Sequence, residues 1–593
     1  MSTQPANAQT DFATATNAAA RPIRPMRLWP AIGLIAAYWV SWVGFSFADL
    51  TISAHFFTSV IGPGVLLLLF LIWWGTNRGV RWTDRLLGIA AVVGGCVLAV
   101  RGMHPSVGFY GALIMALPIG LAIWVVWLMA GGRRSRFVRC WGAILSLLPI
   151  WILFGLTRSF GIDGNLHADM HWRWTPSPEE LLIAERTRAG DKTGVLPIAD
   201  AAPLTLEPGD WPGLRGKNRD GIVRDLRIAT DWSKLPPKQI WRHPIGPAWS
   251  SFAVVGSRLF TQEQRDEAEA VVCLDAATGH EIWVHTDHAR HWDGQGGAGP
   301  RGTPSFADDR IYSLGATGAL NCLDAASGKS KWMRNIADEA QAAVPMWGFS
   351  GSPLVVGQIV IVYAGGEKGL LAYRAATGEP AWSAATGHDG YSSPQLIKIG
   401  GETQVLAFDD AGITAVDSAT GAVRWQQKAA APHMWRTVQP HLIGDRQIVF
   451  GSEDLGLVSL DLKQEQSAWA ISKRWSTNNL KPAYNDFVVS DGSIFGFDGA
   501  LFCCIDAETG QRRWKAGRYG HGQVLLLADQ KLLLVMTESG EVVLLSANRE
   551  KLEELGRFQA LQQKSWNNPA IAHGHLYVRN DQEMACYELP RAP

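Results

Sequence analysis

The first 158 residues consist of long apolar stretches separated by short polar links. The apolar stretches lie near residues 28–48, 55–74, 86–101, 107–130 and 140–157. A helix needs about 20 apolar residues to cross the hydrocarbon core of a bilayer, and most of these stretches reach that length, although the third is short. A cleaved signal peptide would supply one such stretch rather than five. The pattern therefore predicts five transmembrane helices over residues 28–158, after a disordered tail over residues 1–27.

Basic residues in the links predict the orientation of the chain in a membrane. Arginines occupy positions 21, 24 and 27, positions 78, 81 and 85, and positions 133, 134, 136 and 139. The charged residues of the other two links are Asp49 and Arg101. Because positively charged links stay on the cytoplasmic side, we expect a cytoplasmic N-terminus and an inner-membrane protein of a two-membrane bacterium. Everything after Arg158 then lies in the periplasm.

The apolar centres of the stretches contain no Asp, Glu, Lys or Arg. Transport and proton-relay pathways usually need such groups inside the membrane. We therefore interpret the spans as an anchor. The alternative is a quinone or lipid pocket that uses residues at the ends of the spans, such as His55 or His104.

From residue 235 onward the pattern changes to short alternating runs that end in glycine turns. The clearest unit runs from Cys273 through Leu-Asp-Ala-Ala-Thr-Gly279 to Trp283. Its Asp position recurs at residues 275, 324, 374, 417, 461, 506, 546 and 588. Spacings of 40–50 residues between alternating strands and glycine turns are typical of four-stranded propeller blades. The Trp eight positions after the Asp has a large apolar face that can pack between blades.

Eight copies of the unit predict eight blades. The last copy, at Glu588, lies too close to the end of the sequence to have its own Trp strand, whereas Lys238–Trp241 precede the first blade. We expect this N-terminal strand to complete the eighth blade, which leaves no open sheet edge. The predicted fold is an all-β eight-bladed propeller over 235–593, preceded by an α-helical five-span transmembrane domain.

Residues 159–234 connect the two predicted domains. Ser177-Pro-Glu-Glu180 is typical of a capped helix start, so we expect a short helix to about Arg188. Proline- and glycine-rich sequence follows. The segment is predicted to be a periplasmic linker that lies on the propeller.

Charge and cysteine content exclude two classes of protein. The chain has 54 basic and 54 acidic residues, whereas a nucleic-acid-binding protein carries a basic excess. Seven cysteines in 593 residues exclude a disulfide-rich scaffold. Cys503 and Cys504 fall where the repeat places strand residues, so we interpret them as structural. Histidines and aspartates crowd residues 285–293, but no spacing there fixes a coordination geometry, and no metal site is predicted.

The loops that enter the first strand of each blade carry the candidate site, because in a propeller they meet at one mouth of the central channel. We expect aromatic, cationic and polar side chains to form a ring there. The candidates are Trp249, Arg301, Trp347, Trp435, Arg436, Lys481, Arg518, His521, Trp566 and Asn567. Aromatic faces together with converging cations suit a planar polyanion. The alternative is that these residues only pack the channel and cap strand ends.

The unit Asp-Ala-x-Thr-Gly-x-x-x-Trp resembles the pyrroloquinoline quinone (PQQ)-type repeat. The resemblance covers residues 235–593 and implies an eight-bladed propeller. The family contains quinoprotein dehydrogenases, which use PQQ with calcium. It also contains non-catalytic members such as the outer-membrane protein assembly lipoprotein. Since the repeated residues are structural, the resemblance is specific for the fold rather than for an activity.

The layout of five spans followed by such a propeller is similar to that of membrane-bound quinoprotein glucose dehydrogenases. The blades here are compact, whereas those enzymes carry long catalytic insertions. Residues Asp210–Gly221 resemble the opening of bacterial PQQ-binding-like propeller proteins, whose function is largely unassigned.

The sequence leaves two candidate functions for this protein. The favoured one is an inner-membrane-anchored periplasmic propeller that binds a protein partner or a small anionic ligand. The alternative is a PQQ- and calcium-dependent dehydrogenase of a sugar or alcohol that passes electrons to membrane quinone. Such an enzyme needs a carboxylate as general base, and the candidates are Asp389 and Asp486. The scarcity of carboxylates near the predicted mouth favours the binding function.

Overall fold

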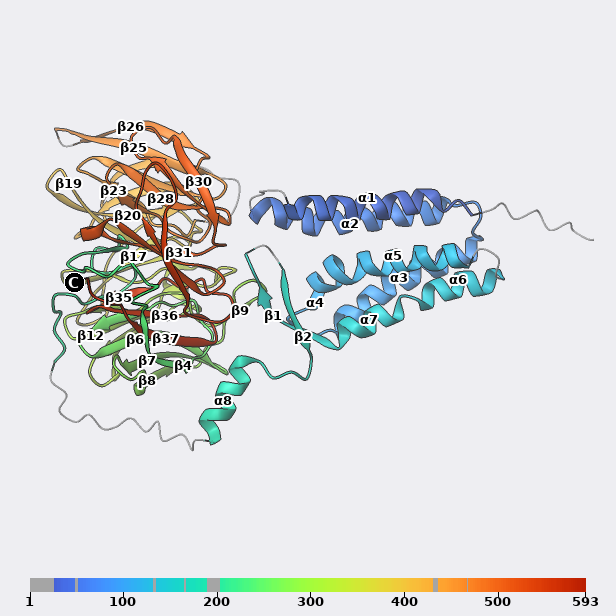
Figure 1. The fold of residues 1–593 in the computed structure, drawn as a ribbon, viewed down its shortest axis with the longest axis horizontal. Helices are drawn as coiled ribbons and strands as arrows, with labels where there is room; N and C mark the ends of the chain where they lie inside the picture. The colour runs from blue at the N-terminus through green and yellow to red at the C-terminus, as the bar shows by residue number, and fades with distance from the viewer. Residues whose placement is uncertain are drawn as a thin grey trace, which may run out of the picture. The chain divides into compact units, whose positions relative to one another are not determined.

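The computed structural model describes residues 26–47, 52–131, 135–164, 167–188, 203–429, 436–466 and 468–592. The chain divides into two compact units, which are described separately. The first unit comprises Met1–Ser46 and Ser59–Leu156, and the second comprises Phe47–Thr58 and Thr157–Pro593 (Figure 1). Nearly all of the predicted tail lies outside the described residues, as do Arg133, Arg134 and Trp435.

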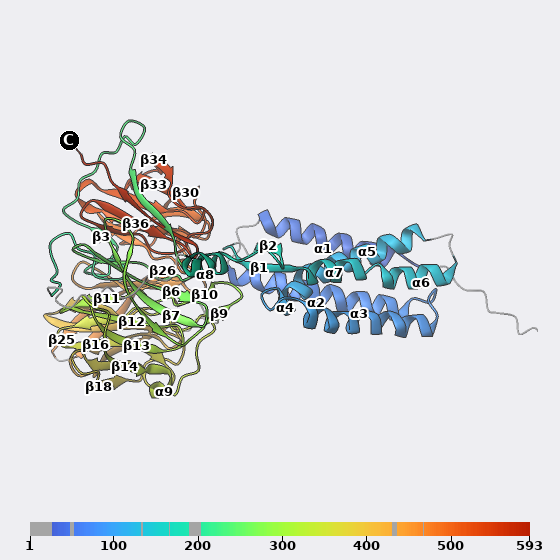
Figure 2. The same ribbon diagram turned by 90° about the horizontal axis from the view of Figure 1, so that it is seen from below.

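The first unit is helical, and Figures 1 and 2 show its long helices running lengthwise beside one another. Its elements are α1 (Trp29–Phe47), α2 (Ile52–Thr76), α3 (Trp82–Gly102), α4 (Gly108–Tyr110), the π-helix η1 (Gly111–Ala116), α5 (Leu117–Ala130), α6 (Arg136–Leu145) and α7 (Leu148–Gly155). Three helical stretches are long and apolar enough to cross a membrane: Thr58–Thr76, Trp82–Gly102 and Gly111–Ala130. Two shorter apolar stretches are Trp29–Phe45 and Cys140–Gly155.

The described part of the chain thus shows three candidate spans of full length, and the predicted count of five is not confirmed. The predicted fifth span is divided between α6 and α7. Pro149 stands in the first turn of α7. Because proline lacks the N–H that a continuous helix would use and its ring clashes with the preceding turn, the helix restarts there.

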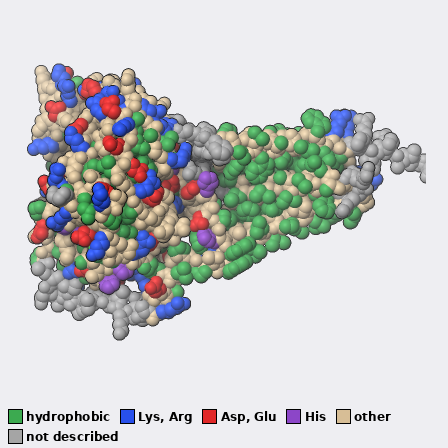
Figure 3. Space-filling view, in the orientation of Figure 1, with side chains coloured by type: hydrophobic (Ala, Val, Ile, Leu, Met, Phe, Trp, Pro, Cys, Tyr) green, Lys and Arg blue, Asp and Glu red, His purple; other side chains and the backbone are tan. Residues whose placement is uncertain are grey.

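Aromatic side chains form the core of the helical unit. The rings of Trp74 and Trp124 meet edge to face with centroids 5.1 Å apart. Gly88 permits this packing, since a Cβ there would lie 2.4 Å from the Trp74 indole nitrogen. The outer surface is apolar too, with Leu68 and Leu98 exposed by 59% and 71%. Figure 3 shows hydrophobic side chains over most of the visible face of these helices. An apolar surface of this extent suits contact with lipid.

The second unit contains eight blades, so the predicted eight-bladed β-propeller is confirmed. The first four blades are β5 (Ala253–Val255), β6 (Arg258–Arg265), β7 (Ala268–Asp275), β8 (Glu281–Asp287); β11 (Ser305–Ala307), β12 (Arg310–Leu314), β13 (Ala319–Asp324), β14 (Ser330–Asn335); β15 (Leu354–Val356), β16 (Ile359–Gly365), β17 (Gly369–Arg374), β18 (Pro380–Ala384); and β19 (Gln395–Ile399), β20 (Glu402–Asp409), β21 (Gly412–Asp417), β22 (Val423–Lys428).

The other four blades complete the ring. They are β23 (His441–Ile443), β24 (Gln447–Ser452), β25 (Gly456–Glu465), β26 (Ala468–Thr477); β27 (Val488–Ser490), β28 (Ser493–Asp498), β29 (Leu501–Asp506), β30 (Arg512–Arg518); β31 (Gln523–Leu527), β32 (Leu532–Met536), β33 (Glu541–Ser546), β34 (Glu554–Gln559); and β35 (Ala570–Ala572), β36 (His575–Arg579), β37 (Glu583–Glu588), β4 (Lys238–Pro244). Short elements in the loops are β9 (Trp292–Asp293), β10 (Gly297–Ala298), α9 (Ile336–Ala340) and the 3-10 turn η2 (Ala528–Gln530).

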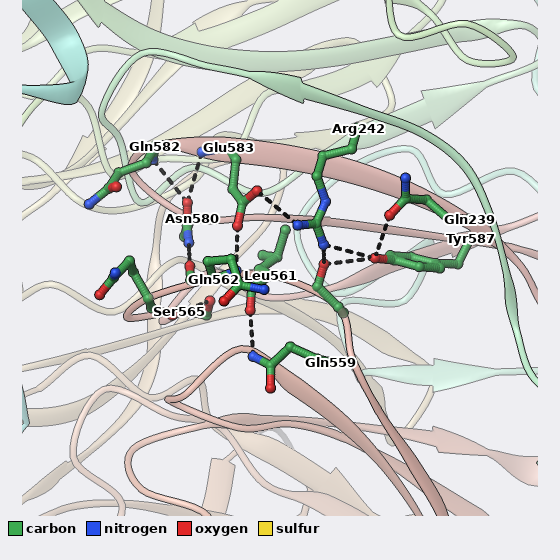
Figure 4. Close-up of polar contacts among 12 residues, drawn as sticks. Gln239, Arg242, Gln559, Leu561, Gln562, Ser565, Asn580, Gln582, Glu583 and Tyr587 are labelled. Carbon is green, nitrogen blue, oxygen red and sulfur yellow. Dashed lines mark hydrogen bonds and ion pairs between the residues drawn. The ribbon is translucent and has the colours of Figure 1, made fainter. Parts of the chain in front are cut away.

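The eighth blade closes with a strand from the other end of the propeller sequence, as predicted. β4 pairs antiparallel with β37 and places Trp241 opposite Cys586. Polar contacts reinforce this seam (Figure 4). The Arg242 guanidinium lies 3.4 Å from the Glu583 carboxylate and donates a hydrogen bond to the Tyr587 hydroxyl at 3.1 Å. The ring therefore has no unpaired edge at its closure.

The repeated Trp and Gly residues pack against each other between neighbouring blades. The Trp283 indole N–H donates to the Ala325 carbonyl of the next blade at 3.1 Å. Its ring lies on Gly328, where a Cβ would come within 2.5 Å of the indole. Gly328 also has a φ of +71°, which side chains other than glycine's adopt at a cost. The same packing recurs at Trp241 and Gly279, Trp332 and Gly378, and Trp382 and Gly421. In the fifth blade Trp475, rather than Trp469 eight positions after Asp461, packs on Gly510.

The segment predicted as a linker is attached to the propeller. It contains β1 (Thr157–Ile162), β2 (Ala168–Trp172), α8 (Pro178–Arg188) and β3 (Ile222–Val223), and β3 adds a parallel strand to β31. Two ion pairs join α8 to the first blade and the loop after it. Glu179 lies 2.9 Å from Arg290, and Arg186 lies 3.0 Å from the buried Glu263.

Candidate functional site

One polar side chain from each blade stands at or two residues before that blade's first strand. These residues, the polar ring, are Ser251, Thr303, Ser352, Ser393, Gln439, Asp486, Gln523 and Asn568. Backbone N–H groups join neighbours across blades, with Ser251 donating to the Thr303 hydroxyl at 3.0 Å and Thr303 donating to the Ser352 hydroxyl at 2.9 Å. First strands of neighbouring blades also contact each other. The polar ring therefore encircles the propeller axis.

A second tier lies two residues earlier in every blade. This aromatic tier consists of Trp249, Arg301, Ser350, Tyr391, Thr437, Tyr484, His521 and Trp566. The Trp566 ring lies between those of Trp249 and Tyr484, with both centroids 4.8 Å away. Trp347 packs on Tyr391 with centroids 5.0 Å apart. Aromatic faces thus surround much of the axis above the polar ring.

Most residues of the two tiers line a cavity of about 160 Å³, which Leu214 also lines. Leu214 belongs to the segment 210–221, which crosses the channel on the side of the polar ring opposite the aromatic tier. Arg215 is fully buried and donates to the Phe487 carbonyl at 2.7 Å in the sixth blade. Arg219 donates to the Pro353 carbonyl at 2.8 Å in the third blade. Because these contacts reach different sides of the ring, the segment forms a floor beneath the polar ring.

Three charged residues are among those described in the cavity wall, and each has a partner of opposite charge. Asp293 forms an ion pair with Arg301. Asp486 lies 3.5 Å from the Arg215 guanidinium and 3.6 Å from the His441 imidazole. Burial by itself raises the pKa of the Asp486 carboxyl, but the nearby Arg215 guanidinium and His441 imidazole outweigh it, so the pKa is lowered overall. The wall therefore presents no isolated charge in its described part.

Several polar atoms of cavity-lining residues lack a hydrogen-bond partner. The Gln523 side-chain amide donates to the Trp566 carbonyl at 3.0 Å, which fixes its orientation and leaves its oxygen unpaired. Gln439 donates to another glutamine side chain at 3.0 Å, and its oxygen is likewise unpaired. The Asn568 side-chain oxygen and the Tyr484 hydroxyl are also buried without a partner. Each of these buried atoms costs free energy while it lacks a hydrogen-bond partner.

The structure brings together four of the ten predicted site residues as lining of the cavity. They are Trp249, Arg301, Trp347 and Trp566. His521 belongs to the aromatic tier, and its ring packs against Tyr484 with centroids 5.5 Å apart. Arg436 is buried beside Thr437 of the same tier. Trp435 lies outside the described residues.

The predicted convergence of cations at the mouth is wrong for Lys481 and Arg518. The Lys481 ammonium lies 3.4 Å from the Asp498 carboxylate instead of in the cavity wall. Arg518 ends β30, the outermost strand of its blade, and is exposed. Asn567 has a structural contact, because it donates to the Ser250 carbonyl at 2.7 Å. Arg301 is thus the one cationic side chain in the described lining.

The two candidate general bases have different environments. Asp486 lines the cavity but is held by its ion pair with Arg215. Asp389 is half-buried outside the cavity lining, and its N–H donates to the Asp410 carboxylate at 3.1 Å. Burial and the nearby Asp410 raise the pKa of the Asp389 carboxyl. The structure therefore does not bring the two carboxylates into one site.

PQQ with calcium, which the repeat resemblance implies, needs particular donors. Calcium takes about six to eight oxygen ligands, carboxylates among them. Both carboxylates in the described wall are already held by arginines, Asp293 by Arg301 and Asp486 by Arg215. Within the described ranges, no group of three or more His, Cys, Asp or Glu could hold a metal ion. The described cavity residues do not fit this cofactor, whose carboxylates would also need unpaired cations.

Sequence reasoning missed most of the polar ring. A signal was present, because proline follows the polar-ring position in five blades. The pairs are Thr303-Pro304, Ser352-Pro353, Ser393-Pro394, Gln439-Pro440 and Asn568-Pro569. Aligning the repeats on these prolines would have given the register of both tiers in these five blades.

Sequence comparisons agree with the repeat. Residues 267–516 match the PQQ-repeat family model described as outer membrane protein assembly factor BamB. The BamB of Burkholderia pseudomallei (strain K96243) is 23% identical over 235 residues, covering 38% of this chain and 58% of that protein. Quinohemoprotein alcohol dehydrogenase ADH IIB of Pseudomonas putida is 32% identical over 120 residues, covering 19% of this chain and 17% of that enzyme. The chain thus spans less than two thirds of either curated relative.

Solved structures show the same fold. Quinohemoprotein alcohol dehydrogenase of Comamonas testosteroni superimposes with a TM-score of 0.50 at 14% identity, over 69% of this chain and 84% of that one. At this identity the likeness concerns the fold alone. With the sequence match, it confirms the predicted resemblance to PQQ-type propellers.

Proposed function

We propose that this chain is a membrane-anchored propeller that binds a small uncharged polar ligand in the axial cavity. The observation that carries the proposal is the charge pairing in the wall, Asp293 with Arg301 and Asp486 with Arg215. An anionic ligand, which is one of the two kinds of partner that the sequence favoured, would have to break one of these buried pairs. An uncharged ligand would leave both pairs intact.

The polar ring and the aromatic tier supply complementary contacts for such a ligand. The unpaired oxygens of Gln439, Gln523 and Asn568 are acceptors, so a ligand with hydroxyl or amide donors would satisfy them. The rings of Trp347 and Trp566 offer apolar faces to the rest of the molecule. Because Leu214 closes the channel beneath the polar ring, the ligand must fit the space between Leu214 and the aromatic tier.

The proposed topology has five crossings, a cytoplasmic N-terminus and a periplasmic propeller. The three long helices supply three crossings. The shorter apolar stretches, Trp29–Phe45 and Cys140–Gly155, would supply the other two. An odd number of crossings places the two ends of the chain on opposite sides of the membrane, as the arginine distribution favours.

A second candidate is the binding of a protein partner. The likeness of residues 267–516 to an outer membrane protein assembly factor favours it. The dehydrogenase alternative finds less support, because the described part of the wall has no carboxylate free of an ion pair to accept a substrate proton.

The test uses the full chain in detergent micelles and measures the melting temperature of the propeller. The probes are glucose and glucuronate, which share a ring and differ in charge, and PQQ with and without calcium. We expect a rise with glucose and none with glucuronate or PQQ. Ser393→Ala, in the polar ring, should abolish the rise, whereas Ser490→Ala, at the far end of β27, should keep it. Calcium-dependent stabilisation by PQQ would contradict the proposal and support the dehydrogenase.

A further inference from the structure

The β1–β2 hairpin carries a pair of exposed tryptophans. Trp172 ends β2 and Trp174 follows it, and their rings stack in parallel with centroids 5.3 Å apart. Trp172 is 47% exposed and Trp174 is 66% exposed. Two large aromatic side chains that stack on each other are seldom this exposed on a protein face that contacts only water. An aromatic pair of this kind is suited to contact with a partly apolar environment rather than with water alone.

The hairpin register fixes the position of this pair along the chain. Trp172 pairs with Thr157, the first residue of β1. Thr157 follows the apolar helix α7 with only Leu156 between them. Because paired residues of antiparallel strands lie about 5 Å apart between Cα atoms, Trp172 is held beside the residue at which the chain leaves that helix.

The other side of the hairpin is already occupied by protein. Phe160 stacks on His171 with centroids 4.1 Å apart, and the Arg158 guanidinium lies over the Phe160 ring. Arg158 also forms an ion pair with Glu180 of α8 at 3.1 Å. These contacts leave the tryptophan side as the open face of the hairpin.

The tip of the hairpin is bonded to the propeller. The Gly164 N–H donates to the Glu538 carboxylate at 2.7 Å, and Lys564 donates to the Ile162 carbonyl at 2.8 Å. Glu538 also accepts the Trp566 indole N–H at 2.8 Å. The hairpin is therefore held at both ends, at its tip by residues next to the cavity and at its open end by its covalent link to α7.

We infer that Trp172 and Trp174 lie in the headgroup layer of the bilayer that holds the helices, which rests on the proposed membrane anchoring. Indoles combine an apolar body with a polar N–H, and they are enriched at both interfaces of a membrane. The occupant of this face is the phospholipid layer, because Trp172 pairs with Thr157, which follows an apolar helix in the sequence with one residue between them. The hairpin then connects the membrane surface to the aromatic tier.

The test is lipid photolabelling of the full chain in phosphatidylcholine vesicles that contain a lipid with a diazirine near the headgroup. We expect label on the peptide that contains Trp172 and Trp174. Peptides with Met333 or Val423 should stay unlabelled, since these residues are also exposed, by 55% and 53%, but lie on outer strands of the propeller. The Trp172→Ser/Trp174→Ser variant should lose most of the label on its hairpin peptide and keep the label on α2.

Three outcomes would overturn the inference. The first is label on the helices with none on the hairpin peptide. The second is a crosslink from the hairpin to a second copy of the chain in place of lipid label. The third is equal labelling of the serine variant in a protein whose melting temperature is unchanged. Extraction of the chain by alkaline carbonate would instead contradict the proposed anchoring, and it is measured separately. The Trp172→Phe/Trp174→Phe variant should retain most of the label, which controls for folding.

Discussion

The ammonium group of Lys564 lies 4.2 Å from the centre of the Trp566 ring and 5.0 Å from that of Trp249. The same group donates to the Ile162 carbonyl of β1. Burial lowers the pKa of this lysine, although nearby carboxylates, Asp581 first among them, oppose the shift. A single side chain thus joins the aromatic tier to the hairpin.

Replacing Lys564 by methionine should loosen the hairpin. Methionine keeps an apolar stem of similar length but removes the hydrogen bond to Ile162 and a cation–π contact of about 1–2 kcal/mol. We expect faster amide hydrogen exchange in 157–162, measured by mass spectrometry on the full chain. Lys463→Met is the control, because Lys463 is 79% exposed on the outer blade surface. Equal exchange in both variants would show that Lys564 does not hold the hairpin.

Breaking the Arg215–Asp486 pair should destabilise the propeller strongly. Either Arg215→Met or Asp486→Asn leaves one group buried without its partner, which costs about 3–5 kcal/mol. The double variant removes both charges and should cost less than the sum of the two. Denaturant unfolding of the three variants measures this coupling. Additive losses would indicate that the pair is not coupled across the channel floor.

The glycines beneath the repeated tryptophans should not tolerate a side chain. Gly328→Ala adds a Cβ in contact with the Trp283 ring at a φ of +71°. Gly357 has a φ of +56° with nothing within 4 Å of a Cβ, so Gly357→Ala isolates the backbone cost. Overpacking a core costs about 1–3 kcal/mol, and we expect Gly328→Ala to exceed Gly357→Ala by this amount in unfolding free energy. Equal losses would mean that the indole moves aside freely.

Glu269 should make the propeller less stable as the pH rises toward neutral. Burial raises the pKa of its carboxyl from 4.5 to about 7, although a hydrogen bond from the Ala316 N–H opposes the shift. The folded state then binds more protons than the unfolded state between these pH values. Unfolding free energy therefore falls as the pH rises through this window, by at most about 1.4 kcal/mol per pH unit.

The Glu269→Gln variant tests this pH dependence because an amide does not titrate. Melting temperatures of the wild type and the variant are compared at about pH 5 and about pH 8. We expect the wild type to lose more stability between the two values than the variant does. A parallel change in both proteins would assign the pH dependence to other groups.

The register of the site was less predictable than the fold. Trp249, Arg301, Trp347 and Trp566, which the loops suggested, line the cavity, and their role in binding stays a prediction. Lys481 and Arg518 were not, because nothing near them in sequence shows that one pairs with Asp498 and the other ends an outer strand. If the alignment of the repeats is wrong by one residue in a loop, a different side chain is predicted to face the propeller axis.

The sequence by itself determined the blades, their number and their closure. The Asp-Ala-x-Thr-Gly turns, the Trp eight positions after each Asp, and the free strand at Lys238–Trp241 are local signals, and local backbone preferences act on neighbouring residues. The charge state of the cavity was decided by the tertiary structure alone. Arg215 precedes the first blade and Asp486 stands at the start of the sixth, so their pairing depends on the folded ring and on distances that no local pattern records. The same ring closure brought paired charges and unpaired amide oxygens together at the place where the sequence predicted a ring of aromatic and cationic side chains.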